Sequence, residues 1–303
     1  MKKKKTYLIT GAGSGFGWEI ALRMAEENED VIAGVANHRQ GKELAEEARK
    51  RNVSIRIAKL DITLPEDREL AGTWDVDVLL NNAAVSLGGS MADIPEEVLR
   101  KQYEVNFFGT IFLTQKVVHQ MVRKGAGKIV FVSSLHGIMA DPISGPYCSS
   151  KFALEAAAES LSKELQEYGI EVAVINPGPY MTGLNDREYA SMSKWQEDVP
   201  ERLFDYENMA FPYEQFLNID PVVEGTIDVM TGKSNEYRTV IPKAMGMYGK
   251  KRQRDLWNKK TNKDLGKRHP LIKREFKMEP ETTVIEGIHR MITDPFQKEE
   301  KKK

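Results

Sequence analysis

The chain has 303 residues, a formal net charge of −1 and 41% hydrophobic residues. This composition suffices for one large domain with appendages or two small domains, and the near-zero charge gives no basis for general binding to nucleic acid or to an anionic membrane. The single cysteine, Cys148, excludes an internal disulfide and fits a reducing compartment. We therefore expect a cytoplasmic protein.

The sequence offers no membrane partner. No stretch approaches the roughly 20 apolar residues that cross a bilayer. MKKKK at the start resembles the charged beginning of a signal peptide, but only about five apolar residues follow, against the roughly 7 to 15 that such a peptide needs. We expect a soluble protein in which these lysines lead into the first strand.

Short apolar runs bounded by turns alternate with amphipathic stretches along the chain. This alternation, with nearly continuous apolar strands, predicts a parallel sheet covered by helices on both faces, which is a doubly wound α/β fold. The expected strands are residues 6–10, 30–35, 54–59, 76–80, 128–132, 171–175 and 237–241, with long helices at about 95–123 and 147–168. A ligand should lie at the carboxyl ends of the strands.

A glycine-rich turn, TGAGSGFG at 10–17, follows the first strand and opens a helix-like stretch. Gly11, Gly15 and Gly17 permit a tight turn, a close backbone approach to a pyrophosphate and close helix packing. The helix N-terminus also offers free N–H groups to phosphates. The turn predicts a dinucleotide site, although a connector without a ligand is the alternative for this motif alone.

Polar motifs follow three later strands. They are Asn81-Asn82-Ala83-Ala84, Ser134 and Asn176-Pro177-Gly178. Because the carboxyl ends of parallel strands meet at one edge of a sheet, we expect these motifs and the glycine turn to converge on one site.

Tyr147 and Lys151 stand four residues apart in a predicted helix, so both side chains lie on one face. A tyrosine titrates near pH 10 on its own, and a lysine one turn away supplies a charge that stabilises its anion. The pair is a candidate proton-transfer device. A chance surface pair is the alternative, and Ser134 and the glycine turn argue against it.

In order and spacing, the motifs resemble those of the short-chain dehydrogenase/reductase family over about residues 5–242. They are TGAGSGFG at 10–17, LDI at 60–62, NNAA at 81–84, YEVNFFG around Asn106, FVSS around Ser134, Tyr147-x-x-x-Lys151 and NPGPYMT at 176–182. The resemblance implies a Rossmann-like sheet and an NAD(P)-dependent oxidoreductase. Ala84 departs from the family pattern, which commonly has glycine there.

The resemblance also implies a role for each matching residue. Tyr147 would exchange a proton with a carbonyl or alcohol oxygen, which Ser134 would hold by a hydrogen bond. Lys151 would lower the pKa of Tyr147 and hold the nicotinamide ribose, and Asn106 would interrupt its helix and position a water between Lys151 and solvent. The implied cofactor contacts are Gly11, Ser14, Gly15, Phe16, Gly17, Asp61, Ile62, Asn82, Ala83, Tyr147, Lys151, Pro177, Gly178 and Thr182.

The end of the second strand leaves the choice of cofactor open. An NAD site expects a carboxylate about 20 residues beyond the glycines, and residues 35–40, VANHRQ, contain no acid. The arginine that the family commonly uses for a 2′-phosphate would fall near Ala36 and is missing. Arg39 or His38 could reach a phosphate, which gives NADP a slight preference over NAD. The alternative is that both are solvated loop residues.

Residues 180–219 follow the last motif, and the family has a mobile lid over the substrate there. The aromatic and methionine residues of this segment include Tyr180, Met181, Met192, Trp195, Phe204, Tyr206, Met209, Phe211, Tyr213 and Phe216. They favour a bulky, largely apolar secondary alcohol or ketone as the small-molecule substrate. Packing of the lid against the body or a neighbouring subunit is the alternative.

Residues 1–242 would form the catalytic domain and residues 243–303 a basic extension with a disordered charged tail. Residues 243–277 carry thirteen Lys or Arg against three Asp or Glu. The extension would cover the active site, dock on another subunit, bind an anion or remain a solvated arm. No nucleic-acid module occurs in it.

The remaining polar residues favour plain interpretations. The five histidines lack metal-ligand spacing, so we expect no metal. His136 would line the substrate pocket or fill a polar loop, and Cys148 would be a small half-buried helix residue. We predict an alcohol dehydrogenase or carbonyl reductase that forms a homodimer or homotetramer through the helices at 95–123 and 147–168. The alternative is a dinucleotide-sensing protein without redox chemistry, which the retained Tyr147 and Lys151 disfavour.

Overall fold

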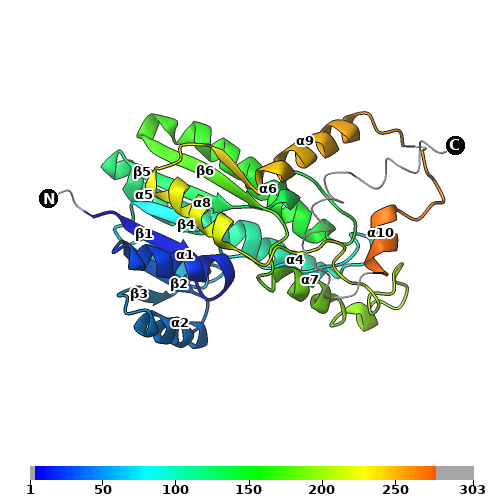
Figure 1. Cartoon of the computed structure of the whole chain (residues 1–303), viewed down its shortest axis with the longest axis horizontal. Coiled ribbons are helices and arrows are strands. Elements are labelled where there is room, and N and C mark those ends of the chain that lie inside the picture. Colours follow the sequence, from blue (N-terminus) through cyan, green and yellow to red (C-terminus); the bar gives the residue numbers. More distant parts are fainter. Residues whose placement is uncertain (1–3, 262, 278–303) are drawn as a thin grey trace.

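The computed structural model describes residues 4–261 and 263–277 (Figure 1). Within them, seven parallel strands form one sheet in the order β3-β2-β1-β4-β5-β6-β7. The strands are β1 (Thr6–Thr10), β2 (Asp30–Val35), β3 (Arg56–Lys59), β4 (Val78–Asn81), β5 (Gly127–Val132), β6 (Ile170–Pro177) and β7 (Arg238–Ile241). Each lies within two residues of the predicted run, so the doubly wound parallel sheet is confirmed.

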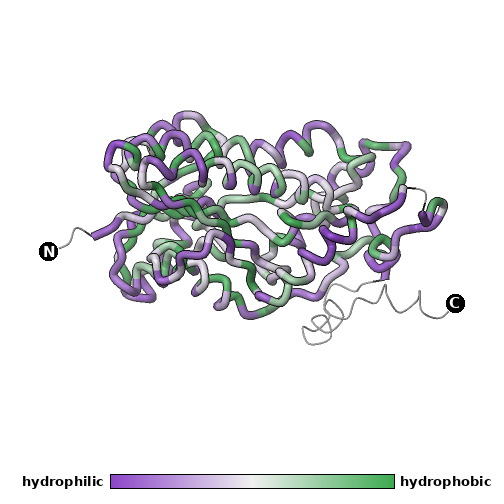
Figure 2. Tube along the Cα trace, turned by 90° about the horizontal axis from the view of Figure 1, so that it is seen from above, coloured by the Kyte–Doolittle hydropathy of each residue, from purple (hydrophilic) through white to green (hydrophobic). Residues whose placement is uncertain are grey.

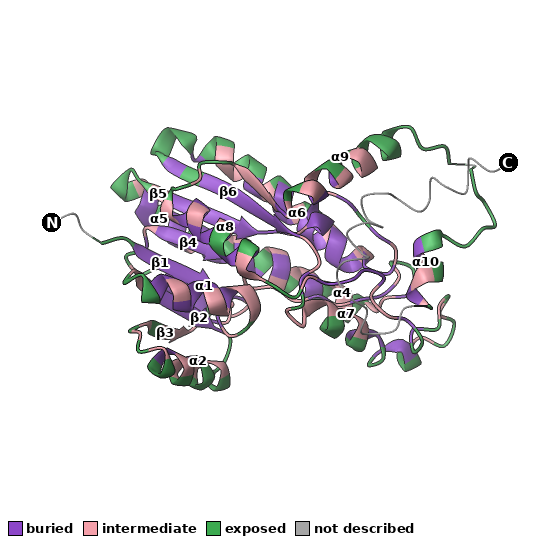
Figure 3. Cartoon of the chain, viewed as in Figure 1, coloured by how far each residue is buried: buried purple, intermediate pink, exposed green. Residues whose placement is uncertain are grey.

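Helices cover both faces of this sheet because its strands are apolar on both sides. Helices α1 (Gly15–Glu26), α2 (His38–Lys50) and α8 (Asp220–Thr231) contribute to one core cluster, and α3 (Pro65–Ala71), α5 (Thr110–Lys124) and α6 (Gly145–Glu164) to the other. Along β5, Val130 packs into the first cluster and Ile129 and Phe131 into the second. Figures 2 and 3 show the apolar, buried strands between these layers.

The predicted continuous helix over 95–123 is wrong in its middle. The chain forms α4 (Glu96–Tyr103), a π-helical turn η1 (Glu104–Gly109) and then α5. Within the turn, the Asn106 side-chain oxygen Oδ1 accepts a hydrogen bond from the Val85 N–H. The Asn106 Nδ2 donates to the Val85 carbonyl and to the Ser150 hydroxyl. The side chain thereby ties the segment after β4 to α6, and the irregularity implied at Asn106 is present.

Within the described residues, two helices follow β7, and both pack against the segment that follows β5. They are α9 (Lys243–Trp257) and α10 (Pro270–Glu275). Met245 of α9 and Leu271 of α10 share a buried cluster with Leu135, Met139 and Tyr213. The helices of this extension are therefore joined to the body, while the predicted disordered tail lies outside the described residues. No described helix has the length and apolar character needed to cross a membrane.

Candidate active site

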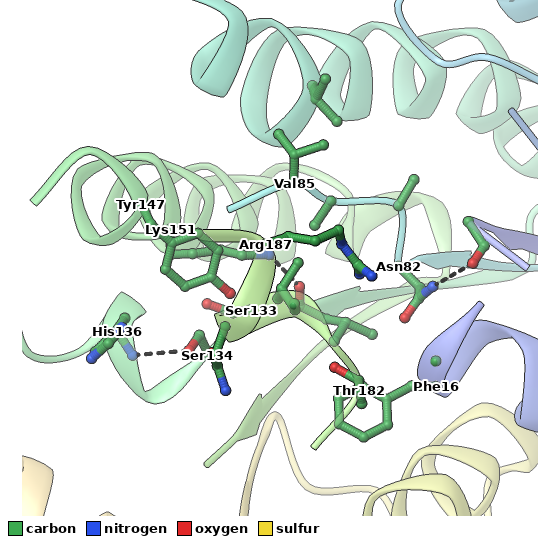
Figure 4. A pocket seen from close by; sticks show the side chains of 18 of the residues that line it. Phe16, Asn82, Val85, Ser133, Ser134, His136, Tyr147, Lys151, Thr182 and Arg187 are labelled. Carbon is green, nitrogen blue, oxygen red and sulfur yellow. Dashed lines mark hydrogen bonds between the residues drawn. The ribbon is translucent and has the colours of Figure 1, made fainter. Parts of the chain in front are cut away.

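A cavity of about 1410 Å³ opens at the carboxyl ends of the central strands. Its walls include every cofactor and catalytic residue predicted from the sequence except Gly17 and Asn106. The predicted residues that line it are Gly11, Ser14, Gly15, Phe16, Arg39, Asp61, Ile62, Asn82, Ala83, Ser134, Tyr147, Lys151, Pro177, Gly178 and Thr182. Figure 4 shows Tyr147, Lys151 and Ser134 gathered toward one end and Asn82 and Phe16 toward the other. The four strand-end motifs thus converge as expected.

The glycine turn is packed tightly against the end of β4. Gly11 has a φ of +65°, and a Cβ there would lie 2.7 Å from the Ala83 Cα. A Cβ at Gly17 would lie 2.4 Å from the Asn82 Nδ2 and 2.6 Å from the Gly11 carbonyl oxygen. Gly17 therefore allows the start of α1 to pack closely against the turn, and it does not line the cavity. The Asn82 amide fixes the same turn by donating to the Thr10 and Gly11 carbonyls, at 2.9 and 3.2 Å.

Ser134, Tyr147 and Lys151 meet where β5 ends against the first turns of α6. Both Tyr147 and Lys151 are buried, and the ammonium lies 5.7 Å from the centre of the Tyr147 ring. The Lys151 Nζ donates a hydrogen bond of 2.9 Å to the Val132 carbonyl. The Ser134 hydroxyl accepts a hydrogen bond of 3.1 Å from the His136 backbone N–H, and its interaction with the phenol opposes the effect of burial on the pKa of Tyr147. A half-buried serine therefore lies together with a buried tyrosine and a buried lysine at this end of the cavity.

The electrostatics of this group differ from the expectation that Lys151 lowers the pKa of Tyr147. Burial raises the pKa of Tyr147 above its ordinary value, and the interaction with Ser134 only partly opposes this rise, while Glu188 and Cys148 add to it. Burial also lowers the pKa of Lys151 to about 8, against an opposing effect of Glu155. In this structure, burial rather than the neighbouring ammonium dominates the pKa of the phenol.

His38 and Arg39 lie in the first turn of a helix and not in a loop, but both are exposed to solvent, as the alternative interpretation expects. Helix α2 begins at His38, and the side chain of Asn37 caps it by accepting a hydrogen bond from the Gln40 N–H. This cap starts the helix earlier than the apolar pattern indicates. The Arg39 side chain is 79% exposed and forms an ion pair of 3.2 Å with Glu43. Arg39 lies at the cavity wall, as does Glu43.

Most of the aromatic and methionine residues in the segment 180–219 pack within the protein. Of the ten predicted to favour a bulky substrate, only Tyr180, Phe211 and Tyr213 line the cavity. Met192, Trp195, Tyr206 and Met209 instead form a separate buried cluster around Ile143. For these four residues the packing interpretation is the correct one.

The sequence analysis missed three charged residues at this site. Arg187 of α7 (Leu184–Met192) lines the cavity and makes no side-chain hydrogen bond or ion pair with the described residues. Glu188, the next residue, is buried and accepts a hydrogen bond of 2.6 Å from the Ser86 hydroxyl. Asp141 is buried behind His136, with its Oδ2 3.2 Å from the His136 Nε2. No local motif marks these residues: Ser86, the partner of Glu188, is 102 positions away in the sequence.

Glu275 on α10 should make the stability of the protein depend on pH. It is fully buried, and the Tyr189 hydroxyl donates a hydrogen bond of 3.1 Å to it. Burial raises its pKa from 4.5 to about 8, the hydrogen bond from Tyr189 opposes this, and Asp141 and Glu188 add to it. Folding therefore takes up a proton between these pKa values, so the free energy of unfolding should fall as pH rises from about 4.5 to about 8.

Glu275→Gln keeps the shape of the protonated acid and removes this pH dependence. At about pH 9 the variant should exceed the wild type in stability by up to a few kcal/mol, since each pKa unit is worth about 1.4 kcal/mol. At about pH 5 the variant should gain nothing. Urea unfolding at both pH values measures the difference. An equal difference at both values would contradict a neutral, buried Glu275.

The doubly wound sheet and the converging strand-end motifs define a Rossmann-like oxidoreductase. The chain belongs to the short chain dehydrogenase family, whose sequence model matches residues 5–193.

Known relatives agree with this assignment. The chain is 39% identical over 188 residues to the uncharacterized oxidoreductase YusZ of Bacillus subtilis. The aligned region covers 60% of this chain and 67% of that protein. It is 30% identical over 242 residues to human retinol dehydrogenase 8, covering 75% and 78% of the two chains. The fold matches that of a short-chain dehydrogenase from Sphingobium yanoikuyae in complex with NADPH, with a TM-score of 0.66, 21% identity and coverage of 88% and 99%.

Proposed function

We propose that the protein is an NAD(P)-dependent carbonyl reductase or alcohol dehydrogenase with Tyr147 as general acid and base. The observation that carries this proposal is the grouping of the half-buried Ser134 with the buried Tyr147 and Lys151 in the cavity that the glycine turn also lines. A bound nicotinamide would supply or accept the hydride. The residues of the chain have to hold the reacting oxygen and move its proton.

Each member of the group has a distinct task in this mechanism. The Ser134 hydroxyl holds the substrate oxygen beside the phenol, and Tyr147 gives its proton to that oxygen during reduction. The raised pKa of Tyr147 keeps the proton in place until charge develops on the substrate. Lys151 holds the nicotinamide ribose and stabilises the phenolate after proton transfer. The role of Asn106 in positioning a water for proton return stays a prediction.

For the cofactor we favour NADP over NAD. The end of β2 reaches the cavity through Ala36, without an acid at the strand end, and Arg39 stands at the same wall. Arg187, which makes no ion pair with the described residues, adds a positive charge on the lid side. Thr182 faces the glycine turn there, since a Cβ at Gly15 would lie 3.5 Å from the Thr182 Cβ. The NADPH complex of the Sphingobium protein supports the same choice.

Replacing Arg39 tests the cofactor choice. Arg39→Ala should weaken NADPH binding by roughly 1.5 to 3 kcal/mol, the contribution of a hydrogen bond to a charged group, and leave NADH binding unchanged. Arg49→Ala on the exposed side of α2 is the matched control. Quenching of the intrinsic tryptophan fluorescence by each cofactor gives the dissociation constants. Equal weakening of both cofactors would show that Arg39 does not recognise the 2′-phosphate.

For the substrate we propose a bulky, largely apolar secondary alcohol or ketone. The residues that line the cavity include apolar and aromatic side chains outside the predicted cofactor contacts: Met91, Leu99, Met139, Phe211, Tyr213, Met245 and Tyr248. The retinol dehydrogenase relative is named for a bulky, largely apolar alcohol, which supports the size and polarity of the proposed substrate; retinol is a primary alcohol, so the name does not bear on the secondary carbon. A panel of small and bulky ketones, followed at the nicotinamide absorbance with each cofactor, tests the proposal. Turnover confined to small polar ketones would contradict the substrate class, and no turnover at all would contradict the activity.

An apolar patch on the helices flanking the sheet supports self-association. Phe108 and Phe112 are stacked with ring centroids 6.0 Å apart, and Phe108, Phe112 and Phe152 are each about 40% exposed. These rings lie on η1, α5 and α6. We propose that the chain forms a homo-oligomer through this face, as the sequence analysis expects for these helices.

A further inference from the structure

A buried carboxylate joins three parts of the chain behind the catalytic group. Asp141 lies between the turn η2 (Leu135–Gly137) and α6, and its side chain is 2% exposed. The Tyr213 hydroxyl donates a hydrogen bond of 2.7 Å to its Oδ2, and the His136 Nε2 lies 3.2 Å from the same oxygen. The Arg252 Nη2 donates a hydrogen bond of 2.9 Å to its Oδ1.

Two of the partners of Asp141, Tyr213 and Arg252, lie beyond the residues that the family model matches. Tyr213 belongs to the lid segment 180–219, and Arg252 belongs to α9, whereas the match ends at residue 193. Arg252 also donates to the Tyr248 hydroxyl at 3.0 Å and to the Ala140 carbonyl at 3.3 Å. The Arg252 side chain therefore contacts Tyr248 within α9 and also joins α9 to the segment that carries Ala140 and Asp141.

The same segment positions the catalytic group. The His136 backbone N–H donates to the Ser134 hydroxyl, and the His136 ring stands edge-on to the Tyr147 ring, with centroids 6.0 Å apart. Burial would raise the pKa of Asp141, but His136, Arg252 and Tyr213 together hold it well below its ordinary value. A buried charge that loses its partner is strongly destabilised, so the position of Arg252 matters to every group around Asp141.

We propose that Asp141, Arg252 and Tyr213 form a latch by which the C-terminal extension holds the lid against the catalytic segment. Arg252 is a positioning residue: it anchors Asp141, which holds Tyr213 of the lid and the ring of His136. Tyr213, Met245 and Tyr248 line the cavity, so the latch also holds the part of the cavity wall that these residues form. Only the expected kinetic effect rests on the proposed reductase activity, because the contacts themselves do not depend on it.

Hydrogen exchange of the full chain with bound NADPH tests the latch without a substrate. Arg252→Gln should speed amide exchange in residues 204–217 and 135–141 by about tenfold or more, because the buried Asp141 carboxylate loses its arginine and keeps only His136 and Tyr213 as partners. Arg254→Gln is the matched control, since Arg254 is an exposed cation on the same helix. Arg252→Lys keeps the charge and should restore much of the protection. Unchanged exchange in Arg252→Gln, or an equal increase in Arg254→Gln, would overturn the latch.

Kinetics and a milder variant complete the test. With a ketone that the wild type reduces, Arg252→Gln should raise KM about tenfold while the dissociation constant of NADPH stays within about twofold. If Arg252→Gln does not fold, Tyr213→Phe removes one hydroxyl from the latch and should speed lid exchange in the same direction. Unchanged exchange in Tyr213→Phe would then overturn the proposal. Altered lid exchange in a protein that reduces no ketone would refute the reductase activity and leave the latch standing.

Discussion

Tyr147→Phe should lower kcat by at least about 100-fold, because general acid catalysis contributes typically 10² to 10⁴-fold. The change removes only the phenolic hydroxyl, which is the group that interacts with Ser134. The ring keeps its buried position and its edge-on contact with His136. The affinity for the nicotinamide cofactor should therefore stay within about twofold of the wild type, since the substitution removes little packing volume.

Single-turnover absorbance measurements with a ketone from the panel give the rate, and fluorescence titration gives the cofactor affinity. Tyr168→Phe is the control, because Tyr168 is 44% exposed and lies outside the cavity wall. It should leave both quantities unchanged. A Tyr147→Phe enzyme that retained more than about a tenth of the wild-type kcat would contradict the proposed proton transfer.

A chain that ends at Pro242 should keep the sheet but lose much of its stability. All seven strands lie before this residue, so the secondary structure of the sheet should persist. The cut removes Met245 and Leu271 from the cluster around Leu135, and burying such a side chain contributes about 1.5 to 3 kcal/mol. It also leaves Asp141 without Arg252. We expect Tm to fall by about 10 °C or more, since each kcal/mol shifts Tm by roughly 2 to 4 °C in domains of this size.

Circular dichroism, light scattering and steady-state kinetics on the shortened chain separate the alternatives for the extension. We expect parallel α/β secondary structure, a lowered Tm and a raised KM for the bulky ketone. A change in mass would show that the extension also docks on a neighbouring subunit. Unchanged Tm, mass and kinetics would leave only the solvated-arm interpretation. Failure to fold would show that residue 242 is not a domain boundary.

The sequence determined the fold and most of the candidate site because both depend on local spacing. Apolar runs separated by helical stretches place each strand within two residues of its observed position. Ser134 and Asn82 follow strands, so a parallel sheet brings them to one edge without knowledge of other contacts. Tyr147 and Lys151 share a helical face through their spacing of four residues. In each case the position of the residue can be predicted from one short segment of the sequence.

The tertiary structure decided what depends on partners far apart in the chain. Asp141 and Arg252 are 111 positions apart, and no pattern around either residue indicates the other. The π-helical turn at Asn106 depends on hydrogen bonds with Val85 and Ser150, which lie on other elements. The pKa of Tyr147 depends on burial by surrounding elements, which outweighs the nearby lysine that spacing does reveal. Burial and long-range pairing are properties of the packed molecule, and for that reason they could not be inferred from spacing along the sequence.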